Sequence, residues 1–183
     1  MRCTDILMEE HELILTGLDV LGAVSRRLAQ GQAVPRATID NLLGFFRDFA
    51  DLHHHAKEEG LLFPALEAAG LPHDAGPIGI MLQEHVQGRE LVAVMREALD
   101  KLDASTEARR RFVDAATWYR DHLAQHIQKE NQVLFRLAEQ VLSPEEGRHL
   151  DRAFDEHAAT RAADLPVRFH AVLSDLNAAV AQP

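Results

Sequence analysis

The chain has 183 residues and a formal net charge of −10, a length that suits one domain with a sizeable core. The negative charge argues against nucleic acid or an anionic membrane surface as a partner, because phosphate groups are bound through clustered cations. No stretch of about 18 apolar residues is present, and the single cysteine, Cys3, cannot form an internal disulfide. We therefore expect a cytoplasmic protein that does not enter the membrane, either as a monomer or as a homodimer.

Apolar residues at helical spacing predict four long helices, and the sequence carries almost no strand signal. The segment from Gly31 to Pro35 separates the first two helices, and a bend is expected near Pro64 in the second. A turn-rich stretch at residues 70–77 precedes the third helix. The expected helix ranges are about 5–29, 35–69, 78–102 and 106–142.

The C-terminal part of the sequence predicts further, shorter helices. Ser143 followed by Pro144 and Glu146 is typical of a capped helix start, and Pro166 is expected to begin or kink a last segment that ends near residue 180. Short connections favour neighbouring helices that run up and down in turn. We therefore expect an all-α, up-down-up-down four-helix bundle at 1–142, with accessory helices at 143–183 packed on it in the same domain.

One pattern occurs twice in the chain. The stretch from His54 to Phe63 and the stretch from His126 to Phe135 both reduce to H-x-x-K-E-[EN]-x-[LV]-L-F, 72 residues apart. Each copy follows a Glu-His pair, and the two pairs are 74 residues apart. The pairs are Glu10-His11 and Glu84-His85. The chain is therefore interpreted as an internal duplication.

The repeated histidines are expected to lie at one depth in the bundle. In an up-and-down arrangement His11 and His85 lie about seven or eight residues from one end, and His54 and His126 about fifteen residues from the same end. Glu58 and Glu130, four residues after a histidine, share its helical face. Buried glutamates need compensating cations, and imidazole with carboxylate suits iron, manganese or zinc. The sequence therefore predicts a metal site built by two equivalent halves.

The pattern H … HxxxE … H … HxxxE resembles the hemerythrin-like (HHE cation-binding) family, over about residues 5–142. The resemblance implies a four-helix bundle that holds two iron ions, with zinc or manganese as substitutes in isolated protein. Carried over by position, it implies His11, His54, His85 and His126 as terminal ligands. It also implies that Glu58 and Glu130 bridge the ions together with an oxo or hydroxo group.

The sequence departs from the oxygen carriers of that family, which have a second histidine on the third helix, four residues from the first. Here those positions are Met81 and Arg89. Four histidines, two bridging carboxylates and one bridging oxygen fill about ten of roughly twelve positions around two octahedral ions, against about eleven in the oxygen carriers. Such an open site favours turnover of a ligand over reversible storage, unless His122 supplies a fifth histidine.

Several side chains near these motifs leave alternatives open. Among the consecutive histidines 53–55, the apolar spacing reaches His53 and the following residues favour His54, and the family pattern decides for His54. His55 is therefore expected to be dispensable for metal binding. Three further residues are candidates for a fifth ligand or for contacts around the ligands, with core packing or solvation as the plainer interpretation. These are His122, Tyr119 and Glu59.

Three classes of function follow from this reading. The first is binding of O2, NO or peroxide at the iron pair, for sensing, storage or defence against oxidative and nitrosative stress. The second is an enzyme that dismutates peroxide or repairs iron–sulfur centres, and the third is an iron-responsive interaction module. A ferritin-like oxidase is disfavoured, because its Glu-x-x-His motif occurs only at Glu146 and His149, outside the expected bundle.

Overall fold

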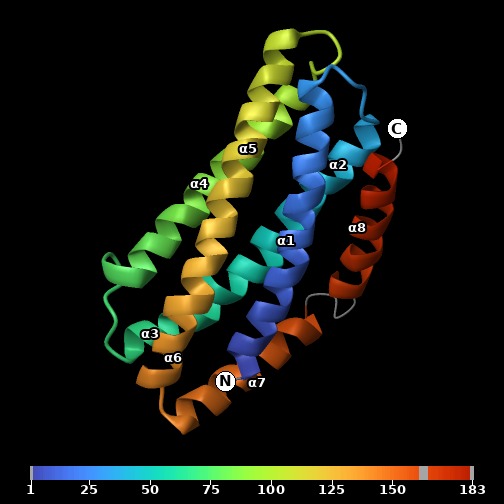
Figure 1. The fold of residues 1–183 in the computed structure, drawn as a ribbon. Helices are drawn as coiled ribbons and strands as arrows, with labels where there is room; N and C mark the ends of the chain where they lie inside the picture. Colours follow the sequence, from blue (N-terminus) through green and yellow to red (C-terminus); the bar gives the residue numbers. More distant parts are fainter. Residues whose placement is uncertain (1, 161–164, 182–183) are drawn as a thin grey trace.

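The computed structural model describes residues 2–160 and 165–181, and these form an all-α bundle (Figure 1). Four helical lines run alternately up and down along its long axis. The first is α1 (Arg2–Ala29) and the third is α4 (Gly76–Leu99). The second line consists of α2 (Arg36–Phe45), η1 (Phe46–His55), η2 (Glu58–Leu62) and α3 (Phe63–Ala68), and the fourth of α5 (Thr106–Lys129), η3 (Glu130–Leu134) and α6 (Phe135–Val141).

The predicted second and fourth helices are continuous in direction but not uniformly α-helical. The segments η1, η2 and η3 are π-helical, and all three overlap or adjoin the two copies of the repeated motif. Pro64 does not end the second line; it lies in the first turn of α3, where its missing N–H costs little. Wide π-helical turns are most often found at functional sites.

The C-terminal helices α7 (Pro144–Thr160) and α8 (Leu165–Ala181) pack on the bundle. Helix α7 crosses its lower end near the N-terminus, and α8 runs beside α1 and α2 (Figure 1). The predicted cap of α7 is present, since the Ser143 N–H donates to Glu146 Oε2 at 2.8 Å and the Glu146 N–H donates to Ser143 Oγ at 3.3 Å. This reciprocal pair satisfies two amide groups at the helix start.

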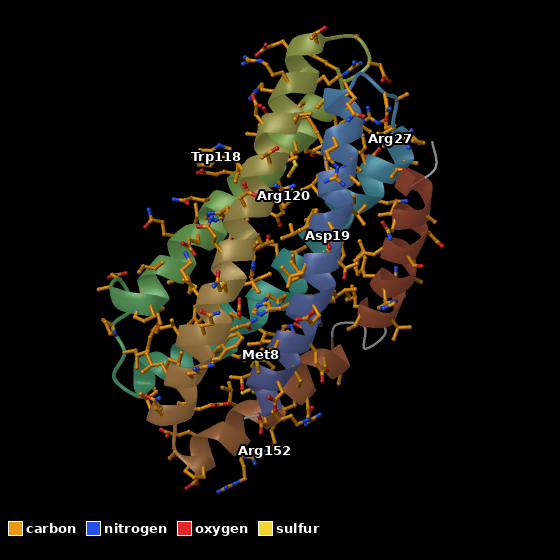
Figure 2. All side chains as sticks on the ribbon, in the orientation of Figure 1. Met8, Asp19, Arg27, Trp118, Arg120 and Arg152 are labelled. Atoms are coloured by element: carbon orange, nitrogen blue, oxygen red, sulfur yellow. The ribbon has the colours of Figure 1, made fainter. Side chains whose placement is uncertain are left out.

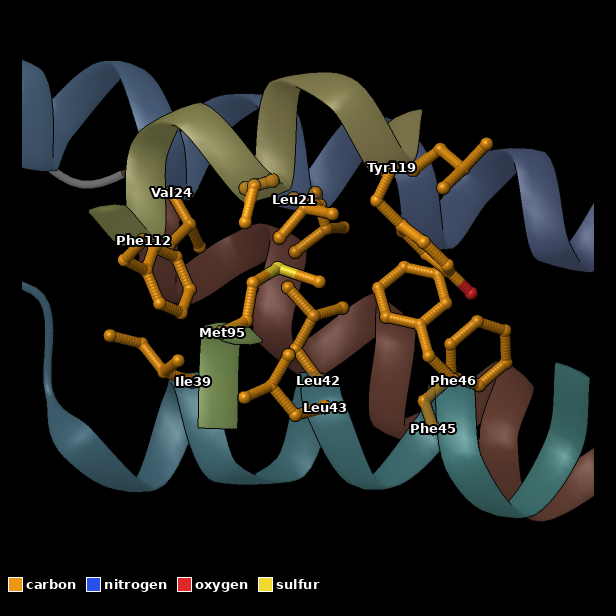
Figure 3. Close-up of a cluster of buried hydrophobic side chains, with 14 of the residues drawn as sticks. Leu21, Val24, Ile39, Leu42, Leu43, Phe45, Phe46, Met95, Phe112 and Tyr119 are labelled. Atoms are coloured by element: carbon orange, nitrogen blue, oxygen red, sulfur yellow. The ribbon is translucent and has the colours of Figure 1, made fainter. Parts of the chain in front are cut away.

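The apolar core divides into two clusters of buried side chains. The larger one lies between α1, α2, α4 and α5 and includes Leu21, Leu42, Phe46, Met95 and Tyr119 (Figure 3). The smaller one lies toward the N-terminus of α1 and is built mainly from residues of α1, α3, α4, α6 and α7. Along α1, Leu7 belongs to the smaller cluster and Ile14 to the larger, so His11 lies between them. The layer of repeated histidines therefore has an apolar cluster above it and another below it along the bundle axis.

Polar and charged side chains cover the outside of the bundle (Figure 2). Among the described residues, Trp118 is the most exposed aromatic residue, with 72% of its surface exposed. None of the described helices is both long and apolar enough to cross a membrane.

Candidate metal centre

Two groups of buried side chains could each hold a metal ion. The first position is formed by His11, His54, Glu58 and Glu130. The second position is formed by His55, Glu58, His85 and His126. Within each group the candidate ligand atoms all lie within 4.8 Å of one another. The structure therefore brings together all six residues that the sequence predicted as ligands, and adds His55.

Each of the two glutamates faces both positions. Glu58 places Oε1 3.5 Å from Nε2 of His54 and Oε2 3.5 Å from Nε2 of His85. Glu130 places Oε2 3.2 Å from Nε2 of His11 and Oε1 3.2 Å from Nε2 of His126. Both side chains are fully buried. Two carboxylates that each direct one oxygen to either position are arranged as bridges between two ions.

The four repeated histidines direct their other ring nitrogen, Nδ1, outward to an oxygen acceptor. In His11 this atom lies 2.8 Å from Asn131 Oδ1, and in His85 it lies 2.7 Å from Glu59 Oε1. A proton on Nδ1 that is held by such an acceptor leaves the Nε2 lone pair free to point inward. This is the ligand arrangement found in most metal-bound histidines, where the outer acceptor also fixes the orientation of the ring.

The acceptors of the remaining two repeated histidines are the glutamates of the Glu-His pairs. Glu10 Oε2 lies 2.9 Å from Nδ1 of His54, and Glu84 Oε2 lies 3.0 Å from Nδ1 of His126. The other oxygen of each glutamate accepts a hydrogen bond from a lysine, which lies three residues after the histidine that the glutamate contacts. These lysines are Lys57, bonded to Glu10, and Lys129, bonded to Glu84. The repeated Glu and Lys residues therefore form an orienting contact at two of the histidines, His54 and His126, a role that the sequence analysis did not assign.

The two orienting contacts differ in their exposure to solvent. The side chain of Lys57 is 3% exposed and lies over the ring of Phe154 from α7, 5.8 Å from its centroid, whereas that of Lys129 is 41% exposed. His53 adds a further contact to Glu10, with Nε2 3.1 Å from Oε1. Helix α7 therefore covers the side of the centre at Lys57, whereas the side at Lys129 lies close to water.

Burial and neighbouring charges set the protonation of the metal-free centre. Burial and the charge of Glu130 raise the pKa of Glu58 well above its ordinary value. Burial also acts to raise the pKa of Glu130, but His126 and His11 outweigh it and hold that pKa well below the ordinary value. Two carboxylates so close together cannot both remain ionised without further cations, and the pair therefore retains a proton on Glu58.

The histidines divide in the same way. Burial and then the charge of His11 lower the pKa of His54 to about 3, and burial and then the charge of His85 lower the pKa of His55 to about 3. Burial also opposes the charged form of His126, but Glu130 and Glu84 outweigh burial and raise the pKa of His126 to about 9. At neutral pH His126 is therefore an imidazolium beside the Glu130 carboxylate, and His54 and His55 are neutral.

The residues present fit a pair of metal ions. Eight buried ligand atoms of the kind that binds iron or zinc make no hydrogen bond within the described chain; they belong to His11, His54, His55, Glu58 and Glu130. Buried polar atoms without a partner are costly and rare in folded proteins. Imidazole nitrogen with carboxylate oxygen, and no thiolate, matches iron, manganese or zinc. Metal binding would satisfy these atoms and neutralise the buried carboxylates.

His55 is where the structure departs most from the sequence analysis. The prediction chose His54 as the inward-facing member of the triple, yet both residues face the centre, and the rings of His55 and His85 stack with centroids 3.9 Å apart. Both residues lie at the end of the π-helical segment η1. A π-helical turn contains more residues than an α-helical turn, so adjacent side chains diverge less around the axis.

The additional candidates lie outside the two positions. His122 has Nε2 3.0 Å from the backbone oxygen of Glu84 and belongs to neither group, so the fifth histidine that the structure brings to the candidate positions is His55 and not His122. Tyr119 packs edge-on against Phe46 in the larger apolar cluster. Glu59 holds the ring of His85 from outside. The alternative that placed Glu59 beside a ligand and not on the metal agrees with this contact.

Comparison with known proteins agrees with this geometry. A family model described as the hemerythrin HHE cation binding domain matches residues 3–138, and matches again over 89–177. The chain belongs to this family. The first match contains all the residues of both candidate metal positions, and the resemblance drawn from the repeated motifs is thereby confirmed. No solved structure matches the hemerythrin-like chain.

Curated relatives include iron-sulfur cluster repair proteins named YtfE, from Salmonella paratyphi B (strain ATCC BAA-1250 / SPB7), Salmonella newport (strain SL254) and Salmonella heidelberg (strain SL476). Each is 31% identical to this hemerythrin-like chain over 121 residues, which cover 61% of this chain and 51% of the relative. The chain therefore spans about half the length of the curated relatives it matches.

Proposed function

We propose that this chain is a non-haem di-iron protein that binds a small ligand, O2, NO or peroxide, for sensing, storage or defence against oxidative and nitrosative stress. The observation that carries the proposal is the placement of Glu58 and Glu130, each with one oxygen toward either group of histidines. His11 and His54 would hold one ion, and His55, His85 and His126 the other. Two bridged iron ions can change oxidation state together and can offer a coordination position to such a ligand.

The chain's own residues would keep the pair in place and dry. Glu10, Glu84, Glu59 and Asn131 fix four ligand rings in the orientation that presents Nε2, and the two apolar clusters exclude water from above and below. With His55 included, five histidines, two carboxylates and one bridging oxygen fill about eleven of roughly twelve positions. The expectation of two open positions, which favoured turnover of a ligand, therefore no longer holds. A single open position supports ligand binding ahead of rapid turnover.

The test is a metal titration followed by spectroscopy. Protein loaded anaerobically with ferrous iron is expected to bind two ions per chain, and added O2 or NO is expected to give a charge-transfer band that fades when the gas is removed. Peroxide is added to a second sample while evolved oxygen is recorded. Sustained oxygen evolution would show that the function is peroxide dismutation and not ligand binding. Uptake of fewer than two ions per chain would refute the di-iron proposal.

Repair of iron–sulfur centres is the second candidate, and the similarity to the Salmonella repair proteins favours it. On this proposal the chain would supply iron to a damaged cluster. A [4Fe–4S] dehydratase that has lost one iron is incubated with the loaded protein, and recovery of dehydratase activity is measured. Free ferrous iron at equal concentration and the metal-free protein serve as controls. Recovery no faster than with free iron would remove this candidate.

A further inference from the structure

His55 is held differently from the other four histidines of the centre. Nδ1 of each of the others lies 2.7–3.0 Å from an acceptor oxygen. Nδ1 of His55 lies 3.7 Å from its nearest carboxylate oxygen, Asp51 Oδ1, and within the described chain neither ring nitrogen makes a hydrogen bond. Asp51 instead accepts a hydrogen bond from Arg89 at 2.7 Å. The ring of His55 therefore lacks the outer contact that fixes its neighbours.

The internal repeat has no second copy of His55. The residue 72 positions later is Ile127, which is buried in the larger apolar cluster. The other ligands all occur in equivalent pairs, namely His11 with His85, His54 with His126, and Glu58 with Glu130. His55 is therefore an addition to a set of ligands that is already symmetric without it.

A cavity of about 560 Å³ reaches His55 from the surface. Its walls are mainly apolar and include Phe46, Val92 and Tyr119. Among the five histidines of the centre, His55 alone is part of the lining that the described residues form. A histidine side chain moves by rotating between staggered positions about its side-chain bonds, and this cavity provides room for such a rotation away from His85.

We propose that His55 is the displaceable ligand of the second metal position: its ring moves into the cavity and a small molecule takes its place. This inference rests on the proposed di-iron function and specifies where the ligand enters. The second position then alternates between three histidines, when His55 is bound, and two, when the small molecule has taken its place. A ligand can select the open arrangement only through its higher affinity for it.

Metal content tests the displaceable role first. His55→Ala is expected to retain two iron ions per chain, because four histidines and two bridging carboxylates remain. His85→Ala and His126→Ala are the matched variants, and each is expected to retain about one ion, since both lose a held ligand of the same position. Loss of one ion from His55→Ala as well would show that His55 is a fixed ligand. If the unmodified protein does not bind two ions, the proposed function itself fails.

The rate of azide binding to the oxidised, iron-loaded protein tests the movement. Val92→Phe fills the cavity beside His55 and is expected to slow azide binding several-fold, with metal content unchanged. Val113→Phe is the matched control, because Val92 and Val113 are both partly buried, pack on the same apolar cluster and line separate pockets. His55→Ala is expected to bind azide faster than the unmodified protein, since no ring must move.

Ala93→Leu narrows the same cavity from the neighbouring position, and it replaces Val92→Phe if that variant does not fold. Equal azide rates in the unmodified protein, in His55→Ala and in the filled variants would overturn the inference. In that case two bound ions would still be compatible with the proposed di-iron function.

Discussion

Glu10 Oε2 lies 2.9 Å from Nδ1 of His54, although 44 residues separate the two in the chain. The equivalent contact joins Glu84 to His126 at 3.0 Å across 42 residues. In both cases a glutamate on one helix orients a histidine on another. The histidine that follows the glutamate in the sequence, His11 or His85, faces the centre itself. Each Glu-His pair therefore supplies one candidate metal ligand and one contact that holds another.

Glu10→Gln and Glu84→Gln should weaken metal binding without removing a ligand. The amide keeps the shape of the side chain but loses the charge that favours a proton on Nδ1 and a lone pair on Nε2. We expect a loss of affinity of roughly 10–100-fold in each variant, as for other residues that orient metal ligands. Competition with a chelator of known affinity measures the effect. Unchanged affinity in both variants would mean that the contacts do not orient the ligands.

Lys57 and Lys129 occupy equivalent places in the repeat but should differ in their effect on stability. Replacing Lys57 by Met leaves Glu10 buried without its lysine, and we expect the free energy of unfolding to fall by about 3 kcal/mol. The ammonium group of Lys129 is near solvent, so Lys129→Met should cost less than about 1 kcal/mol. Urea unfolding of the metal-free proteins compares them. Equal costs would show that the cover provided by α7 has no energetic consequence.

Neutralising Glu58 and neutralising Glu130 should have very different effects on the stability of the metal-free protein. Since the raised pKa of Glu58 keeps it protonated at neutral pH, Glu58→Gln should change the stability by less than about 1 kcal/mol. Glu130 is ionised beside His126 and His11, so Glu130→Gln removes one of the two carboxylates that face the buried imidazolium of His126 and should cost about 3 kcal/mol. Both variants should fail to hold the metal pair. Thermal unfolding with and without metal separates the two effects.

Metal loading should release protons at pH 7. Ligand histidines must be neutral and bridging glutamates ionised. With a pKa of about 9, His126 is protonated at this pH in the metal-free centre, and Glu58 also carries a proton. His54 and His55, with pKa values of about 3, have none to lose. His126 and Glu58 should therefore release about two protons between them, and the apparent affinity for metal should rise as the pH increases toward 9.

Calorimetry in two buffers with different ionisation enthalpies measures this release. The observed heat of binding should differ between the buffers in proportion to the number of protons released. A heat that does not depend on the buffer would contradict the assigned protonation of His126 and Glu58.

The helical bundle could be predicted from apolar periodicity, and the six candidate ligands from the repeated motif together with the family pattern, which decided for His54. Apolar spacing located the helices, and a repeat length of 72 residues placed His54 and His126 at one depth. The inward position of His55 could not be predicted in this way, since it depends on a π-helical turn that has no signature in the spacing. The roles of Glu10 and Lys57 could have been found, because both residues recur in the second copy of the repeat, as Glu84 and Lys129. The sequence analysis used this recurrence only to recognise the repeat.

The two bridging glutamates come from different halves of the repeat, Glu58 from the first and Glu130 from the second. Either half alone is a helical hairpin with two of the paired histidines and one of the paired glutamates, so each candidate position needs ligands from both halves. Two identical hairpins related by a twofold axis would supply every paired ligand and both orienting glutamates. The present chain is thus equivalent to such a pair joined covalently by the turn at residues 70–75, and the joining is what permitted His55 and Ile127 to become different.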